Sequence, residues 1–365
     1  MVQQQSLNQS LASAAVAQRT AVAAPRAGAG IGARARLSAF SYALVLPAVV
    51  ILALFHIFPI FYGFFISLHK WGVKDLGYIG LRNYRQVFTD EEFWNSMKVT
   101  LWYVLGTVPI GIVLALALAI LLFRPIAGRT FYRVMLFLPY ITPPIAIAKV
   151  WAWMYQQDRG LMNTFVGWFG IGPQRWLLDP RGLFEIIGSA FGLHLTGVLS
   201  GPSMPLFSTM VYSVWAAVGF DTVVFLAGLA NVPNEVVEAA EVDGANRWQI
   251  ATQIIAPLLK PTIVFISIIS TLRAFQSFNA VYGLFGDQAP EGAKVITVQI
   301  FNEFFRDVGR VGYGAATAMI LFLILFVITL LQLRLTSERK DDGERTAGGR
   351  GGRGARGMRG QLHGS

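Results

Sequence analysis

The sequence contains no cysteine among its 365 residues. Disulfide bonds, thiolate catalysis and cysteine-based metal sites are therefore excluded. Histidine is also scarce, and the four histidines show no spacing typical of metal ligands. We therefore expect neither a metal site nor a cofactor.

Recognisable enzyme motifs are missing as well. The sequence has no Gly-x-x-x-x-Gly-Lys-Ser/Thr phosphate loop and no Ser/His/Asp arrangement of recognisable spacing. We expect no catalytic residues, and no ATP binding through such a loop. A membrane-embedded lipid or glycan transferase would need an acidic or histidine cluster at one interface, and we find none, so this alternative is less favoured.

Charged residues are few. They make up 14% of the chain, whereas hydrophobic residues make up 54%, and the mean hydropathy is +0.53. A soluble domain of this size is nearer a quarter charged. Because the apolar residues are gathered in long unbroken segments, the composition predicts an all-α integral membrane protein.

Six segments are long and apolar enough to cross a bilayer of roughly 30 Å as helices. These six predicted transmembrane helices are 42–68, 98–123, 131–155, 206–230, 262–285 and 312–333. They place a single six-helix membrane domain at residues 38–335.

The segments outside the six helices differ in character. Residues 1–37 lack apolar periodicity and predict a disordered arm, and residues 336–365 predict a disordered basic Gly/Arg tail. Such a tail can bind RNA or anionic lipid, but a solvated tail that fixes topology is favoured, and we expect no nucleic-acid partner. Residues 182–205 are apolar but rich in glycine, so we favour an interfacial or re-entrant piece over a seventh span.

A polar stretch at residues 233–261 lies between two predicted spans and reads as helix, turn, helix. Pro233 suits a first helical turn, and Gly244 can adopt the left-handed conformation that stops the first helix. Asn246 and Gln249 have the spacing of a capping box for the second helix, which Pro257 is expected to end. Two short helices meeting at a glycine corner form a compact knob that can dock in a partner's cleft.

The same stretch resembles the EAA loop of ATP-binding cassette (ABC) importer permeases, in their carbohydrate branch. The resemblance is carried by Glu238-Ala239-Ala240, by Asp243-Gly244-Ala245 and by the prolines that follow. It implies the type I importer permease fold over about residues 40–335. It also implies that a coupling helix contacts a cytoplasmic ATPase through Glu238, Ala239, Ala240, Asp243, Gly244, Ala245 and Pro257. The partners so implied are a second permease subunit, an ATPase dimer and an extracytoplasmic solute-binding protein.

Basic residues predict the orientation. With both termini and the knob on one side, that side carries 17 Lys and Arg, and the other carries 11. The side richer in these residues is cytoplasmic. We therefore expect an inner-membrane protein, surrounded by lipid, with both termini inside the cell and the knob within reach of an ATPase.

Polar and aromatic side chains within the spans are candidates for a substrate pathway, because lipid makes buried polar groups costly. Amides and hydroxyls pair with sugar hydroxyls, and aromatic rings pack on the apolar faces of sugar rings. The candidates are Phe275, Gln276, Phe278, Asn279, Tyr282, Trp215, Asp221 and Thr317. Helix packing explains Gln276 and Asn279 about equally well and is favoured for Trp215, Asp221 and Thr317. For Asp221 we also considered a salt bridge with Lys149 or exposure near the outer interface.

The sequence therefore predicts the permease subunit of an ABC importer that translocates a carbohydrate. A permease for a non-sugar solute, such as glycerol phosphate or a polyamine, is an alternative, and Arg273 makes an anionic substrate conceivable. A channel or scaffold without an ATPase is a further alternative. The segment 298–308 predicts an amphipathic helix that lies flat at the interface, with Phe301 and Phe305 on its apolar face and Glu303 opposite.

Overall fold

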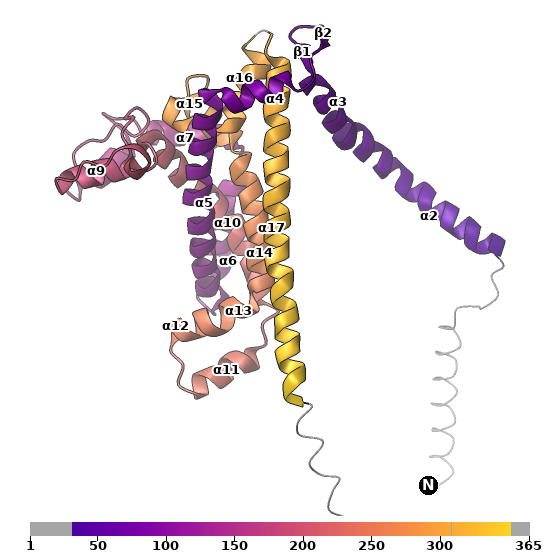
Figure 1. Ribbon diagram of the computed structural model, residues 1–365. Coiled ribbons are helices and arrows are strands. Elements are labelled where there is room, and N and C mark those ends of the chain that lie inside the picture. The colour runs from indigo at the N-terminus through magenta and orange to yellow at the C-terminus, as the bar shows by residue number, and fades with distance from the viewer. Residues whose placement is uncertain (1–30, 308, 352–365) are drawn as a thin grey trace, which may run out of the picture. The chain divides into compact units, whose positions relative to one another are not determined.

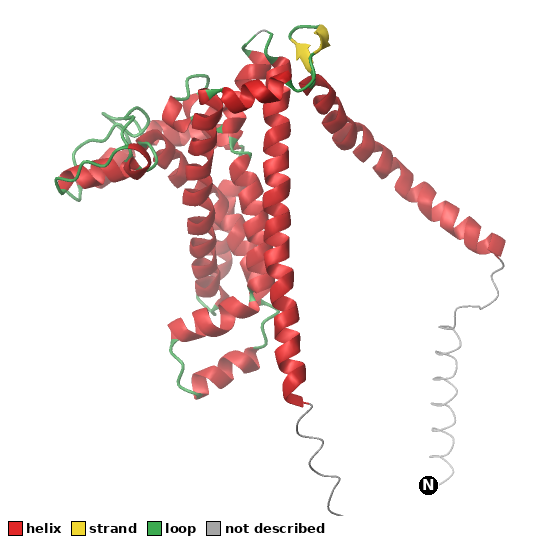
Figure 2. Ribbon diagram, viewed as in Figure 1, coloured by secondary structure: helices red, strands yellow, loops and turns green. Residues whose placement is uncertain are grey.

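The computed structural model describes the backbone of residues 31–307 and 309–351, and side chains from residue 42 to residue 334 except 308. The chain divides into two units, Met1–Tyr62 and Gly63–Ser365. Within the described residues the secondary structure is helical apart from one small strand pair (Figure 2).

The described residues of the first unit form one helical segment, which runs on to Ser67. Helix α2 spans Ile31–Leu52, a π-helical turn follows at Ala53–Ile57, and α3 spans Phe58–Ser67. Together Tyr42–Ser67 are long and apolar enough to cross a membrane. Helix α2 already includes residues 31–37, which we had expected to be disordered, and the rest of the expected arm lies outside the described residues. Since nearly all side chains described in this unit are exposed, they suit a lipid environment.

In the second unit a small strand pair follows the end of α3. Strands β1 (His69–Trp71) and β2 (Asp75–Tyr78) pair antiparallel, and the short helix α4 (Arg82–Thr89) follows. The Asn83 side chain donates to the backbone carbonyls of Ser67 and His69 at 2.7 and 2.9 Å. This buried amide holds the start of α4 against the strand pair.

Four long helices form the core of the second unit: α5 (Glu91–Phe123), α10 (Met204–Leu229), α14 (Lys260–Phe275) and α17 (Val311–Gly351) (Figure 1). Helix α5 begins seven residues before the predicted span, because Asp90 caps it by accepting a hydrogen bond from the Glu92 backbone at 2.9 Å. Ala115 and Ala119 of α5 are fully buried in the cluster that contains Phe225 of α10. Small residues at such a crossing let two membrane helices approach closely.

Two of the predicted spans are broken in the structure. Helices α6 (Arg129–Ile141) and α7 (Pro144–Met154) meet at an angle of 99°, and Pro143 and Pro144 lie at the bend. The predicted span 262–285 is also two helices, α14 and α15 (Phe278–Phe285), separated at Gln276 and Ser277.

The number of spans depends on how the bent pairs are counted. Among the described residues, four helices are long and apolar enough to cross a membrane, and six if each bent pair counts as one span. The second bent pair joins Arg247–Leu258 to α14 at 75°.

The connection at residues 156–205 contains no spanning helix among its elements. It contains α8 (Leu161–Gly167), α9 (Leu183–Ala190) and a 3-10 turn at Gly197–Ser200. In Figure 1 this region projects sideways from the bundle beside α7. A seventh span is therefore absent from this segment.

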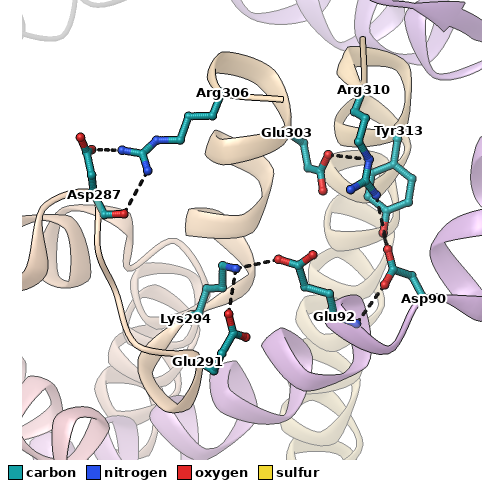
Figure 3. Close-up of polar contacts among 9 residues, drawn as sticks. All are labelled: Asp90, Glu92, Asp287, Glu291, Lys294, Glu303, Arg306, Arg310 and Tyr313. Carbon is teal, nitrogen blue, oxygen red and sulfur yellow. Dashed lines mark hydrogen bonds and ion pairs between the residues drawn. The ribbon is translucent and has the colours of Figure 1, made fainter. Parts of the chain in front are cut away.

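Helix α16 (Ile296–Phe305) corrects one prediction. We expected its phenylalanines to face an apolar environment within the interface and Glu303 to face water. Instead the Glu303 side chain is buried together with that of Gln299. The burial of Glu303 depends on a tertiary contact, because its carboxylate forms an ion pair at 3.0 Å with Arg310, which precedes α17 (Figure 3).

Helix α17 corrects a second prediction. It continues to Gly351, although we expected a disordered tail from residue 336. The first part of this segment, Glu338-Arg339-Lys340, has good helix propensity, and no proline interrupts it. Residues 352–365, the rest of the expected tail, lie outside the described part of the chain.

Candidate functional site

The knob predicted at residues 233–261 is present as two short helices. Helix α11 spans Asn234–Val242 and Asp243 ends it. Gly244 adopts a φ of +80°, which favours glycine, and the Ala245 backbone N–H donates to the Ala240 carbonyl at 2.9 Å. The glycine corner predicted from the sequence is confirmed.

The second helix of the knob begins as predicted but does not end as predicted. Asn246 and Gln249 form reciprocal backbone–side-chain bonds of 2.8 and 2.9 Å at the start of α12 (Arg247–Gln249). A π-helical turn and α13 (Ala256–Leu258) follow. Pro257 does not end the helix, because the Leu259 backbone still donates to the Ile255 carbonyl at 2.9 Å. The chain turns only between Leu258 and Lys260.

One face of the knob packs on the bundle and the other is exposed. Ala240, Ile250 and Ile255 are buried in the same cluster as Leu229 and Leu259. On the exposed face, Val242 is 88% and Trp248 is 76% accessible. Of the predicted coupling residues, Glu238, Ala239, Asp243, Gly244 and Pro257 are exposed, Ala245 is half-buried and Ala240 is buried. The knob lies at the end of the bundle opposite α16 (Figure 1).

A cavity of about 240 Å³ lies between α5, α6, α7, α10, α14 and α15. Its polar lining comes from five spans or half-spans. Three of the predicted pathway residues, Asp221, Gln276 and Asn279, line this cavity. Gln276 and Asn279 are exposed side chains at and after the break between α14 and α15. The break between α14 and α15 therefore places both amide side chains in the lining of the cavity.

The remaining pathway candidates do not line the cavity. Phe275 is buried against Tyr313 and Ala316, and Thr317 is fully buried and donates to the Tyr313 carbonyl at 3.1 Å. Phe278 and Tyr282 stack on each other with centroids 5.1 Å apart. Trp215 lines a separate apolar groove of about 740 Å³ on α5 and α10. None of these five residues lines the cavity.

Asp221 is neither paired with Lys149 nor exposed, and both suggestions made from the sequence are wrong. Its carboxylate lies 2.6 Å from the Arg273 guanidinium, and its side chain is only 4% accessible. This pair could not be predicted from the sequence, because the two residues lie 52 positions apart on different helices. Sequence reasoning also missed several hydroxyl groups that line the cavity, which are those of Tyr103, Thr107, Tyr140, Thr142 and Ser213.

A second polar cluster lies at the end of the bundle that carries α16 (Figure 3). The Lys294 ammonium lies 2.7 Å from Glu92, which is in the first turn of α5. The Tyr313 hydroxyl of α17 donates to Asp90 at 2.7 Å. Burial raises the pKa of Glu303 to about 7, and the nearby Arg310 opposes this rise. These contacts tie the start of α5 to α16 and α17, which makes the cluster an element of stability.

Residues 107–340 match the family described as the inner membrane component of binding-protein-dependent transport systems. The chain belongs to this family. It is the membrane-spanning permease component of an ABC transporter and not an enzyme. Among the described residues, no group of three or more His, Cys, Asp or Glu side chains is placed to hold a metal ion.

The permease is similar to curated relatives over most of its length. It is 30% identical to the trehalose/maltose transport system permease protein MalF of Thermococcus litoralis, covering 84% of this chain and 96% of the relative. It is 28% identical to the trehalose transport system permease protein SugA of Mycobacterium tuberculosis, covering 90% and 98%.

A solved structure supports the fold. It is a bacterial alginate ABC transporter in complex with an alginate pentasaccharide-bound periplasmic protein. One of its chains matches with a TM-score of 0.66 at 22% identity, covering 81% of this permease and 93% of that chain. The type I importer permease fold expected from the sequence is thus confirmed.

Proposed function

We propose that the permease translocates a carbohydrate across the inner membrane. The observation that carries this proposal is the cavity between the spans, which is lined by two amides, several hydroxyls and tyrosine rings. Amides and hydroxyls exchange hydrogen bonds with sugar hydroxyls, and aromatic rings pack against the C–H faces of a sugar. The two relatives named for trehalose and maltose transport agree with this substrate class.

We further propose that the knob is the coupling element. Its exposed face combines apolar side chains, Val242 and Trp248, with the acidic Glu238, and such a face suits docking in a partner's groove. The partner is one subunit of a cytoplasmic ATPase dimer. A second, different permease chain completes the membrane pathway, and a solute-binding protein delivers the sugar on the opposite side. The excess of basic residues on the knob side supports placing both termini and the knob in the cytoplasm.

The substrate proposal is tested by transport in proteoliposomes that contain the whole importer. Uptake is measured with a panel of radiolabelled mono- and disaccharides. Gln276→Ala and Asn279→Ala each remove hydrogen-bonding groups from the cavity, so we expect uptake to fall on the order of tenfold. Gln288→Ala, which removes an exposed amide from outside the cavity lining, is the matched control and should retain uptake. Unchanged transport in both cavity variants would remove these amides from the pathway.

The coupling proposal is tested by labelling, which the absence of cysteine makes simple. Ala239→Cys places a thiol on the exposed face of the knob. We expect membrane-impermeant maleimide to label it only from the cytoplasmic side, and a bifunctional reagent to link it to the ATPase. Labelling from outside alone, or the absence of any link to the ATPase, contradicts the proposed coupling.

A further inference from the structure

The charged side chains that line the cavity bear on the class of sugar that it accepts. We propose that the Asp221–Arg273 ion pair makes the permease selective for uncharged sugars, with Asp221 as the specificity-determining residue. In this arrangement Asp221 neutralises an arginine that would otherwise attract acidic sugars or sugar phosphates. This inference rests on the proposed function, because it assigns a substrate class to the same cavity.

The geometry ties Arg273 closely to Asp221. Nη2 of Arg273 lies 2.6 Å from Oδ1 of Asp221 and donates to the hydroxyl of Ser270 at 2.8 Å. The Ser270 hydroxyl in turn donates to Oδ2 of the same carboxylate at 3.3 Å. Both carboxylate oxygens therefore have a partner, which is the condition for keeping a buried ion pair within a membrane helix bundle.

Aromatic rings hold the other faces of the guanidinium. The Cζ atom of Arg273 lies 5.9 Å from the Tyr140 ring centroid and 5.4 Å from that of Phe220. These two rings stack on each other with their centroids 4.6 Å apart. The guanidinium is thus fixed between a carboxylate and an aromatic pair, and its position relative to the cavity is set by three helices.

The two partners differ in access to the cavity. The Asp221 side chain is 4% accessible and that of Arg273 is 30% accessible, and both residues line the cavity. Arg273 is therefore the more accessible partner of the pair. Removing the charge of Asp221 would convert this position from a neutral pair into an unpaired, partly accessible cation.

The charge of the whole cavity follows from this pair. Among the residues that line it, only Asp221 and Arg273 are charged, and they carry opposite signs. An acidic sugar would lose hydration on entry and would find a cation that already has its counter-charge. A neutral sugar loses no charge hydration and keeps the amides and hydroxyls as partners. The lining therefore favours the neutral sugar.

A purely structural role is the competing explanation, since the pair also joins α10 to α14. A role in selectivity is distinguished from a structural role by measuring how the charge of a reagent affects its reaction in the cavity, which does not require transport. Ala217→Cys places a single thiol in the cavity lining, one helical turn before Asp221. The thiol reacts with small methanethiosulfonate reagents, one anionic and one cationic, in the intact importer, and the modification of this chain is followed by mass.

We expect Asp221→Asn to raise the ratio of anionic to cationic reaction rates at this thiol by about tenfold. Asp221→Glu keeps the charge and should keep the original ratio. The double variant Asp221→Asn/Arg273→Gln, which again has no net charge, should return the ratio close to its original value. Asp179→Asn is the matched control, because it removes a carboxylate from a 2.6 Å ion pair outside the cavity lining.

A sugar that occupies the cavity should shield the same thiol from modification. Comparing a neutral with an acidic sugar therefore tests whether the charge of Asp221 determines which sugar binds. In the parent Ala217→Cys chain we expect maltose to slow the modification and digalacturonate to leave it unchanged, and Asp221→Asn should reverse this preference. An unchanged rate ratio in Asp221→Asn overturns the inference, even where maltose still protects and the proposed function stands. A changed ratio without protection by any neutral sugar supports the electrostatic role and contradicts the carbohydrate proposal.

Discussion

The crossing of α6 and α10 gives the sharpest test of the packing. An added Cβ at Gly219 would meet the backbone carbonyl group of Leu136 and would lie 3.0 Å from Cα of Phe137. These are backbone atoms in a helix, so they cannot rotate away as a side-chain tip can. Gly219→Ala therefore has to push α10 away from α6.

The cost of this displacement is that of overpacking a close helix crossing, about 1–3 kcal/mol. For a chain of 365 residues such a loss lowers the apparent melting temperature by roughly 1–4 °C. The displacement also reaches the cavity, because Phe220 is the next residue and stacks on Tyr140 of α6 at 4.6 Å. We therefore expect reduced transport together with reduced stability.

Thermal unfolding of the purified importer in detergent, followed by tryptophan fluorescence, measures the change. Gly111→Ala is the matched control, since Gly111 lies inside α5 and, apart from the adjacent backbone of that helix, its added Cβ meets no atom within 4 Å. This substitution should leave the melting temperature unchanged or raise it, because alanine favours a helix over glycine by up to about 1 kcal/mol. If Gly219→Ala is as stable as Gly111→Ala, the close approach of α10 to α6 is refuted.

Three further predictions concern the knob and the opposite end of the bundle. Gly244→Ala meets no steric contact, so its cost is the left-handed backbone alone, about 1–2 kcal/mol. ATP-driven uptake should fall partly, whereas Gly244→Glu should abolish uptake and leave membrane insertion intact. Asn246→Ala removes one cap, worth about 1 kcal/mol, and should speed hydrogen exchange in residues 247–255. Burial raises the pKa of Glu303 from 4.5 to about 7, so stability should fall as the pH rises from 5 to 8, by at most about 3 kcal/mol. Glu303→Gln cannot ionise, so its melting temperature should lack this pH dependence, and a dependence equal to that of the parent would contradict the assignment.

The local structure of the knob could be predicted from the sequence because it depends on near neighbours. The capping box needs only Asn246 and Gln249 three positions apart, and the corner needs only a glycine at position 244. The end of the second helix could not be predicted in this way. A π-helical turn at Ile250–Ile255 and the packing of Leu259 on the bundle carry the helix past Pro257.

For the membrane spans, too, some features could be predicted from the sequence and others could not. Length and apolarity were enough to find each membrane segment, because the bilayer imposes both on any spanning helix. They were not enough to find the break at Gln276 and Ser277, because no proline or glycine marks it in the sequence. That break turns Gln276 and Asn279 towards the cavity, whereas the nearby Phe275 is buried against α17.

The sequence by itself determined a multi-span membrane protein with a helix–turn–helix at residues 233–261, because hydrophobic length and short-range capping are properties of consecutive residues. The resemblance of that helix–turn–helix to the EAA loop pointed to the permease family, which the family match confirms. Only the tertiary structure decided which polar groups share the cavity. Asp221 and Arg273 meet because α10 and α14 pack together, and Glu303 is buried because Arg310 lies beside it. Helix packing decides which side chain lies beside a buried charge. The sequence of each helix alone does not show which distant helix it packs against, so such a pair cannot be predicted from sequence periodicity.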